Sequence, residues 1–388
     1  MGKRAFVAIV SLVILSQILA ACAGGPAEES VCGDGICSEG EDASTCEVDC
    51  GAEIAVLPTD THEPTPTEEI EPLGYVTFAV YLSDIVHHNE SAETVLALID
   101  LFEQYDLHGE FYLSGPMTYV YSQEHGEVIE RLREADMGIS YHVQPPHPLV
   151  PGFQGPLTGL PVDETGLMIT RYESERLDLE TGGLVPDEPG GYRYLEELLG
   201  TPPVAVDVPK SSRTGFALPI LSRFGARMTV LPVETDPQQP FVEEYSMLVR
   251  PADLLINRWE AEVVEGPRSW WEMQASEFKA DFSPQERLMN EANAWDSERF
   301  PLILVPINEY SFYRSGPAPW SLIYYQDTAR SASKSPPFDL NAEDPSSERG
   351  EADRQAVWDA YEAMIEWASV YLDPVTSEDI LAIAGGSE

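Results

Sequence analysis

Apolar and polar positions follow two alternating periods through residues 75–147. Short runs rich in β-branched and aromatic residues alternate with longer runs in which apolar side chains recur at helical spacing. The pattern predicts a β-α-β-α-β unit, with polar residues at 89–91 capping the first helix and Gly138 following the second. The predicted elements are a strand at 75–84, a helix at 92–105, a strand at 110–113, a helix at 123–137 and a strand at 138–142.

The same alternation continues toward the C-terminus, so the sequence indicates an α/β fold. Residues 145–191 are rich in Gly and Pro without a steady period, which predicts a long loop at the sheet edge. Residues 236–285 show no clear pattern, and a capping motif at 376–379 predicts a final helix. The other predicted elements are helices at 192–199, 215–224 and 352–372 and strands at 203–208, 227–231 and 302–307.

Three potential metal ligands follow strands of the first unit. Asp84 ends the first strand, His142 ends the third, and His147 lies beyond a Pro-Pro pair. The carboxyl ends of parallel strands meet at one edge, so we expect these side chains to converge. A carboxylate and two imidazoles would hold a divalent metal and leave a position open for water or substrate. The alternative is that the histidines are ordinary loop residues and Asp84 marks a helix entry.

Charge narrows the set of partners. Lys and Arg number 22 against 67 Asp and Glu, which gives a formal net charge of -45. This excess repels nucleic acid phosphates and anionic lipid head groups. We therefore expect no nucleic acid partner, and membrane contact only through a covalent anchor.

The N-terminus indicates export. Residues 1–21 combine a short basic start with an apolar stretch that is too short for a comfortable membrane span. This segment leads into Leu19-Ala20-Ala21-Cys22, which resembles a bacterial lipobox and predicts lipidation of Cys22. We expect an extracytoplasmic lipoprotein anchored at the cell membrane. The alternative is an ordinary signal peptide followed by an incidental cysteine.

A small Cys-rich module is predicted at 22–50. Four further cysteines allow two disulfides in three possible pairings; they are Cys32, Cys37, Cys46 and Cys50. Acidic side chains between them are suitable oxygen ligands for calcium, and the favoured alternative is a disulfide-linked spacer without metal. A Pro/Thr/Glu-rich linker follows at 51–73, and the main domain spans 74–388.

The order of motifs resembles the polysaccharide deacetylases, the carbohydrate esterase family with a NodB homology domain. Ser83-Asp84 is similar to the end of the family's first strand, and 110–115 is similar to its second strand. Residues 141–148 resemble its His-x-x-x-His-Pro motif with one extra residue, and 218–230 resembles a later helix and strand. The resemblance covers about 75–307 and implies a distorted (β/α) barrel, a divalent metal, expected to be zinc, and a polysaccharide substrate.

The chain also departs from the family pattern. Ser83 stands where the family has the aspartate that acts as general base, and Val208-Pro209-Lys210 is only a loose match to its Arg-Pro motif. No histidine follows His147, so the family's late general acid is missing, and Asn308-Glu309 follows the corresponding strand. The resemblance therefore supports the metal site better than the acid and base.

Other side chains are candidates for the missing roles. His88, or its neighbour His87, is a candidate base or additional ligand, and Glu309 is a candidate acid because burial can raise the pKa of a carboxyl group. The alternatives are exposed histidines and an ordinary polar residue at a strand end. Three tryptophans could stack on sugar rings or belong to the core: Trp270, Trp271 and Trp320.

Three functions are consistent with these features. The leading hypothesis is a monomeric, metal-dependent hydrolase that removes acetyl groups from a cell-surface or environmental polysaccharide. The second is a glycan-binding lipoprotein that retains the deacetylase fold without the chemistry, which Ser83 and Asn308 favour. The third is metal-dependent cleavage of another bond on the same barrel.

Overall fold

The computed structural model describes residues 71–209, 211–231, 242–244, 247–251, 284–293 and 302–385, all within one unit, Ile70–Glu388. Within this part of the chain, no helix has the length and apolar character to cross a membrane. Several predictions lie outside the described residues: the signal peptide, the Cys-rich module with its possible calcium, the linker as far as residue 70 and the roles of Trp270 and Trp271.

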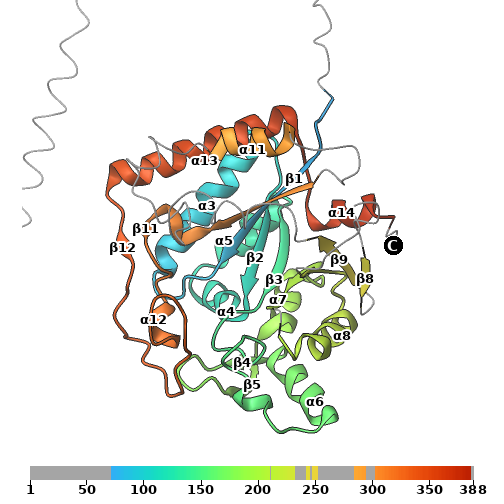
Figure 1. Cartoon of the computed structure of the whole chain (residues 1–388), viewed down its shortest axis with the longest axis vertical. Coiled ribbons are helices and arrows are strands. Elements are labelled where there is room, and N and C mark those ends of the chain that lie inside the picture. The colour runs from blue at the N-terminus through green and yellow to red at the C-terminus, as the bar shows by residue number, and fades with distance from the viewer. Residues whose placement is uncertain are drawn as a thin grey trace, which may run out of the picture. The chain divides into compact units, whose positions relative to one another are not determined.

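A nine-stranded sheet forms the centre of the described chain (Figure 1). Its order is β10-β1-β2-β3-β6-β7-β9-β8, with β13 beside β1, and among the described pairs of this sheet only β8–β9 is antiparallel. The strands are β1 (Tyr75–Leu82), β2 (Glu110–Ser114), β3 (Gly138–His142), β6 (Ala205–Asp207), β7 (Met228–Leu231), β8 (Val242–Glu244), β9 (Met247–Pro251), β10 (Leu302–Asn308) and β13 (Asp373–Pro374).

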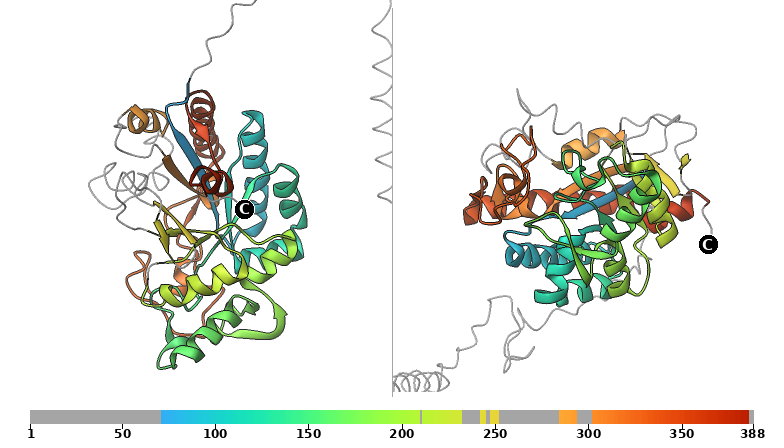
Figure 2. Two further views of the ribbon diagram at one scale, coloured as in Figure 1. Left: turned by 90° about the vertical axis from the view of Figure 1, so that its right-hand side faces the viewer. Right: turned by 90° about the horizontal axis from the view of Figure 1, so that it is seen from below.

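The predicted α/β class is confirmed. The sheet curls (Figures 1 and 2), but no pairing within the described residues joins its end strands β8 and β10, so it is a half-barrel. The main helices are α3 (His88–Gln104), α4 (Gly115–Glu124), α5 (Gly126–Glu134), α6 (Val162–Tyr172), α7 (Gly191–Leu199), α8 (Thr214–Phe224), α11 (Pro284–Asn293), α12 (Ser321–Tyr324), α13 (Glu351–Tyr371) and α14 (Ser377–Ile383).

Apolar side chains pack on both faces of the sheet. Alternate residues of β1, such as Phe78 and Val80, join a large cluster with the buried faces of α3, α5 and α13. Ala79, between them, belongs to a second cluster with Tyr112 and Met228 on neighbouring strands. This is the alternation expected of a strand that is buried on both sides.

The helix predicted at 123–137 is confirmed only as the shorter α5, and the helix α4 that precedes it was missed. The two helices meet at His125. Helix α4 begins directly after β2, where the Ser114 hydroxyl accepts the backbone N–H of Met117 at 3.3 Å. Gly138 is the first residue of β3 rather than a helix terminator, and a Cβ there would lie 2.4 Å from a carboxyl oxygen of Glu110.

The predicted cap of the first helix is also wrong. Helix α3 begins at His88, and the side chains at 89–91 do not cap it. Instead, Asp84 Oδ1 accepts the backbone N–H groups of Val86 (3.0 Å) and His87 (3.1 Å) in the turn that leads into the helix. The Ser91 hydroxyl is directed elsewhere, to the hydroxyl of Tyr121 at 2.7 Å.

Residues 145–191 contain more regular structure than predicted. They form α6 and a short hairpin of β4 (Glu175–Leu177) and β5 (Leu184–Pro189). The buried residues of α6 are Thr165, Ile169 and Tyr172. This helical pattern covers only a few residues between segments rich in Gly and Pro, so the sequence did not predict the helix. The final helix is confirmed, with a reciprocal cap between Thr376 and Asp379.

Candidate functional site

The carboxyl ends of β1 and β10 bring a buried glutamate against the predicted aspartate. Tyr81 pairs with Asn308 in parallel register, so Glu309 lies beside the turn at Ser83-Asp84. Glu309 Oε1 accepts the backbone N–H groups of Ser83 and Asp84, both at 2.6 Å. Burial, helped by the charge of Asp84, raises the pKa of the fully buried Glu309 carboxyl to about 8.

Asp84 also orients a histidine. Its Oδ2 lies 3.1 Å from Nδ1 of His87 and accepts the hydroxyl of Tyr313 at 2.9 Å. Nε2 of His87 lies 3.3 Å from Asp344, which in turn binds the guanidinium of Arg314. The hydrogen bond to Asp84 raises the pKa of His87 against the opposing effect of burial. A partly exposed imidazole is thus held between two carboxylates, an arrangement suited to proton transfer.

The two predicted histidine ligands have other partners. Nε2 of His142 lies 3.0 Å from the carbonyl oxygen of Leu82, which can only accept, so this nitrogen carries the proton. Nδ1 of His147 accepts the backbone N–H of Leu149 at 3.2 Å, which leaves the His147 proton on Nε2, 3.5 Å from Glu173. Burial lowers the pKa of His142 to about 4 and of His147 to about 3, so both are neutral at pH 7.

The three predicted ligands do not meet at one point. Within the described residues, the one group of three such side chains with ligating atoms within 4.8 Å of one another is His88, Glu124 and His125. As arranged, Asp84, His142 and His147 do not fit a shared ion, and their assignment as ligands stays a prediction. The space lined by His142 and His147 measures about 10 Å³, about the volume that one water needs.

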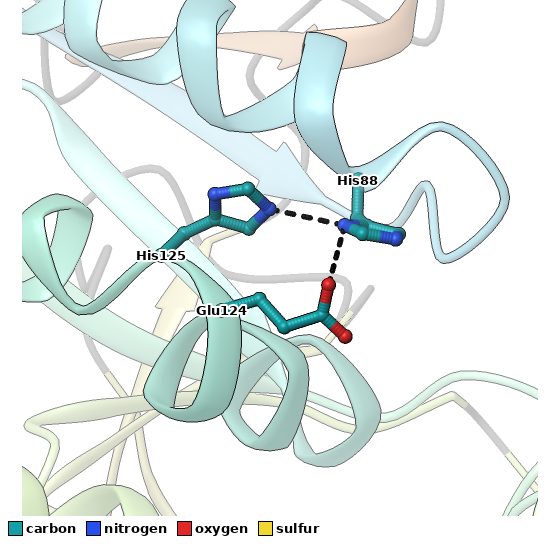
Figure 3. A group of neighbouring side chains, drawn as sticks. All are labelled: His88, Glu124 and His125. Carbon is teal, nitrogen blue, oxygen red and sulfur yellow. Dashed lines mark hydrogen bonds and ion pairs between the residues drawn. The ribbon is translucent and has the colours of Figure 1, made fainter.

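His88 contacts a second histidine rather than Asp84 (Figure 3). It is the first residue of α3, and its Nδ1 lies 3.0 Å from Nε2 of His125, at the junction of α4 and α5. Glu124, the last residue of α4, places Oε2 3.8 Å from the same His88 nitrogen. Of the two adjacent candidate histidines, His87 therefore belongs to the Asp84 cluster and His88 to this separate group.

Several of these residues were missed by sequence analysis. Glu124 and His125 fall inside what the pattern predicts as one continuous helix, which hides the junction that brings them to His88. Tyr313 and Asp344 lie more than 200 residues from Asp84 in the chain and follow no motif. Trp320 is buried, as the core alternative predicts, with the Arg330 guanidinium 4.6 Å from its ring centroid.

Comparison with known proteins gives matches among solved structures only. No protein-family model matches the sequence, and no curated protein matches it. A protein from Mycobacterium smegmatis described as a polysaccharide deacetylase is 15% identical, with a TM-score of 0.38 over 62% of this chain and 78% of that one. A family 4 carbohydrate esterase from Streptomyces lividans in complex with acetate is 10% identical, with a TM-score of 0.30 over 61% and 80%.

A third similar structure is the 4-alpha-glucanotransferase from Thermococcus litoralis, which is 9% identical with a TM-score of 0.44. That match covers 81% of this chain and 40% of the transferase. Polysaccharide deacetylases, the family that the motifs resemble, are thus among the structural matches. At this level of similarity, no residue role is carried over to this chain.

Proposed function

We propose that the protein is a hydrolase that removes acetyl groups from a polysaccharide at the carboxyl edge of its sheet, with His87 as the proton-transferring side chain. The observation that carries this proposal is the position of His87 between Asp84 and Asp344. The substrate class is supported by the order of sequence motifs.

The chemistry assigned to His87 needs one nitrogen that is fixed and one that can exchange partners. Asp84 and Tyr313 fix the ring through Nδ1, from within the protein. Nε2 faces the partly exposed Asp344. Water or substrate can therefore replace Asp344 as the partner of Nε2. Water would attack the acetyl carbonyl while His87 takes one of its protons. The bond from the acetyl carbon to the sugar nitrogen or oxygen would then break, the same proton would pass from His87 to that nitrogen or oxygen, and acetic acid would be released.

Acetate release by the full chain tests the proposal. An N-acetylglucosamine oligomer and an O-acetylated xylan are suitable probes. His87→Gln should lower the rate by about 100-fold or more, because a general acid–base group contributes roughly 10²–10⁴-fold. His108→Gln, which changes an exposed histidine outside the site, should leave the rate unchanged. The proposal fails if the unmodified chain releases no acetate from either probe.

A non-catalytic glycan-binding protein is the second candidate. It is favoured by the small space between His142 and His147 and by Ser83 at the position of the family's base. In that case, glycan would bind equally to the unmodified chain and to His87→Gln, and neither would release acetate.

We also propose a cellular location for the protein. Export, lipidation of Cys22 and anchoring at the cell membrane are supported by the sequence at 1–22. Cys22→Ser should move the protein from the membrane fraction to the soluble fraction, and an unlipidated wild-type chain would overturn this part.

A further inference from the structure

We propose that His88, Glu124 and His125 bind a divalent transition metal ion of the zinc class. The three side chains come from the start of α3 and from the junction of α4 and α5, and they point toward one another (Figure 3). This inference is independent of the proposed hydrolysis, because metal binding can be measured without any substrate.

The spacing of the ligating atoms is close to that of a zinc site. Nδ1 of His88 and Nε2 of His125 are 3.0 Å apart. Zn–N bonds of about 2.0–2.1 Å in tetrahedral geometry place two ligand nitrogens about 3.3 Å apart. Oε2 of Glu124 lies 3.8 Å from His88 Nδ1, and the ligating atoms of all three residues lie within 4.8 Å of one another, so Glu124 must move closer to complete the same geometry.

Neighbouring charges favour a cation at this point. Oε1 of Glu127 lies 3.7 Å from Nδ1 of His125, which favours the tautomer with a proton on Nδ1 and a lone pair on Nε2, toward His88. A carboxylate that orients the far side of an imidazole is the usual supporting partner of a metal-bound histidine. The positive end of α3 opposes a cation at His88, but Glu124, Glu127 and the net charge of -45 act in the other direction.

The ligand types select the class of ion. Two imidazoles and one carboxylate suit zinc and its neighbours, whereas calcium and magnesium prefer oxygen ligands. The histidine side chains are 25% and 13% exposed and that of Glu124 is 58% exposed, so solvent can supply a fourth ligand. Three protein ligands with water in the fourth position are a common zinc arrangement.

The group is connected to the carboxyl edge of the sheet. The ring of His125 packs edge-on against Tyr121, whose hydroxyl binds that of Ser91. The Ser91 hydroxyl in turn lies 3.5 Å from Oε1 of Glu309. An ion at His88 would therefore fix the start of α3 immediately after the turn that holds Asp84 and His87.

Isothermal titration of zinc chloride into the chelator-treated full chain tests the proposal. His88→Ala and His125→Ala should each abolish one equivalent of bound zinc. Glu124→Gln should lower the affinity for zinc. Loss of a residue that only supports a ligand costs roughly 10–100-fold in affinity, and loss of the ligand itself should cost at least as much. The matched control, His108→Ala, should retain it, and circular dichroism should show all four variants folded.

Cobalt substitution separates this site from other candidates. Visible absorption of bound Co²⁺ should appear without a thiolate charge-transfer band and should disappear in His88→Ala. A thiolate band alone would place the ion on the cysteines and overturn the proposal. So would an equivalent of metal that is lost in His142→Ala but kept in both His88→Ala and His125→Ala.

Discussion

The two edges of the parallel sheet each hold a buried glutamate, but the surroundings of the two carboxyl groups differ. At the amino edge, Glu110 accepts the hydroxyl of Ser140 on one oxygen and the backbone N–H of Ser377, at 2.7 Å, on the other. At the carboxyl edge, Glu309 receives both backbone N–H groups on Oε1, and its buried Oε2 has no hydrogen-bond partner within the described chain. Glu110 thus joins β2, β3 and α14, whereas one oxygen of Glu309 has no partner among the described residues.

The larger hollow and the oriented histidine lie at opposite edges of the sheet. A hollow of about 440 Å³ lies at the amino edge, lined by Glu110, Gly138 and Thr376 among others. The carboxyl edge has the oriented histidine and the buried carboxylates, and the space lined there by His142 and His147 is about 10 Å³. Hollow size alone would select the amino edge, whereas the oriented histidine on which the proposed function rests lies at the carboxyl edge.

The largest expected effect is on stability in acid, at the carboxyl edge. Burial lowers the pKa of His142 to about 4, from 6.5, so below pH 6.5 the unfolded chain gains a proton that the folded chain does not. Stability should therefore fall between pH 6.5 and 4, by a few kcal/mol at about 1.4 kcal/mol per pKa unit. His142→Gln should flatten this slope in urea unfolding measured at a series of pH values. If the slope is unchanged and matches that of the exposed control His108→Gln, the buried His142 is not the source of the loss of stability in acid.

Glu110→Gln should give the next largest effect. The new amide must direct its NH₂ group toward either the Ser377 N–H or the Ser140 hydroxyl, and neither orientation satisfies every donor. We expect the free energy of unfolding to fall by about 1–3 kcal/mol, the cost of an unsatisfied buried polar group. Urea unfolding at pH 7 measures it, with the exposed Glu93→Gln as matched control. Equal stability of the two variants would show that Glu110 does not join the three elements.

A smaller loss is expected for Thr376→Ala at the same edge. The Thr376 hydroxyl accepts the backbone N–H of Asp379, and Asp379 accepts the backbone N–H of Thr376 at 2.8 Å. Loss of this cap should cost about 1 kcal/mol. Thermal unfolding followed by circular dichroism measures the loss, and a variant as stable as the wild type would mean that α14 does not depend on its cap.

The smallest effect is predicted for Glu309→Gln. The amide oxygen can keep both backbone hydrogen bonds, and burial raises the pKa of Glu309 to about 8, so at pH 7 a mostly neutral carboxyl is replaced by a neutral amide. We expect the free energy of unfolding to change by less than about 1 kcal/mol. A loss as large as that of Glu110→Gln, measured in the same urea series, would remove the difference between the two edges.

Sequence patterns predicted the sheet better than the site. Strands β1, β2, β3 and β10 and helices α7, α8 and α13 were predicted to within a few residues, because their apolar spacing is regular. The position of Asp84 at the carboxyl edge also followed from the pattern. The partners of Asp84 did not, because the side chains that surround it come from a turn and from two distant loops.

Hydrogen bonds of the ring nitrogens explain why the predicted ligands, Asp84, His142 and His147, do not gather at one point in the structure. The motif at 141–148 places two histidines near the edge, but backbone hydrogen bonds occupy Nε2 of His142 and Nδ1 of His147. The break between α4 and α5, which brings His125 to His88, has no strong breaker except Gly126. Side-chain orientation of this kind depends on tertiary packing and cannot be derived from spacing alone.

The most direct measurement of the chemistry assigned to the carboxyl edge is a double-mutant cycle on acetate release with Asp84→Asn and His87→Gln. The two side chains are 3.1 Å apart, and we propose that they act as one unit. Each single variant should be slower than the unmodified chain, and the double variant should be no slower than the slower single variant. A double variant whose loss is the product of the two single losses would show that the residues act independently and would contradict the proposed site.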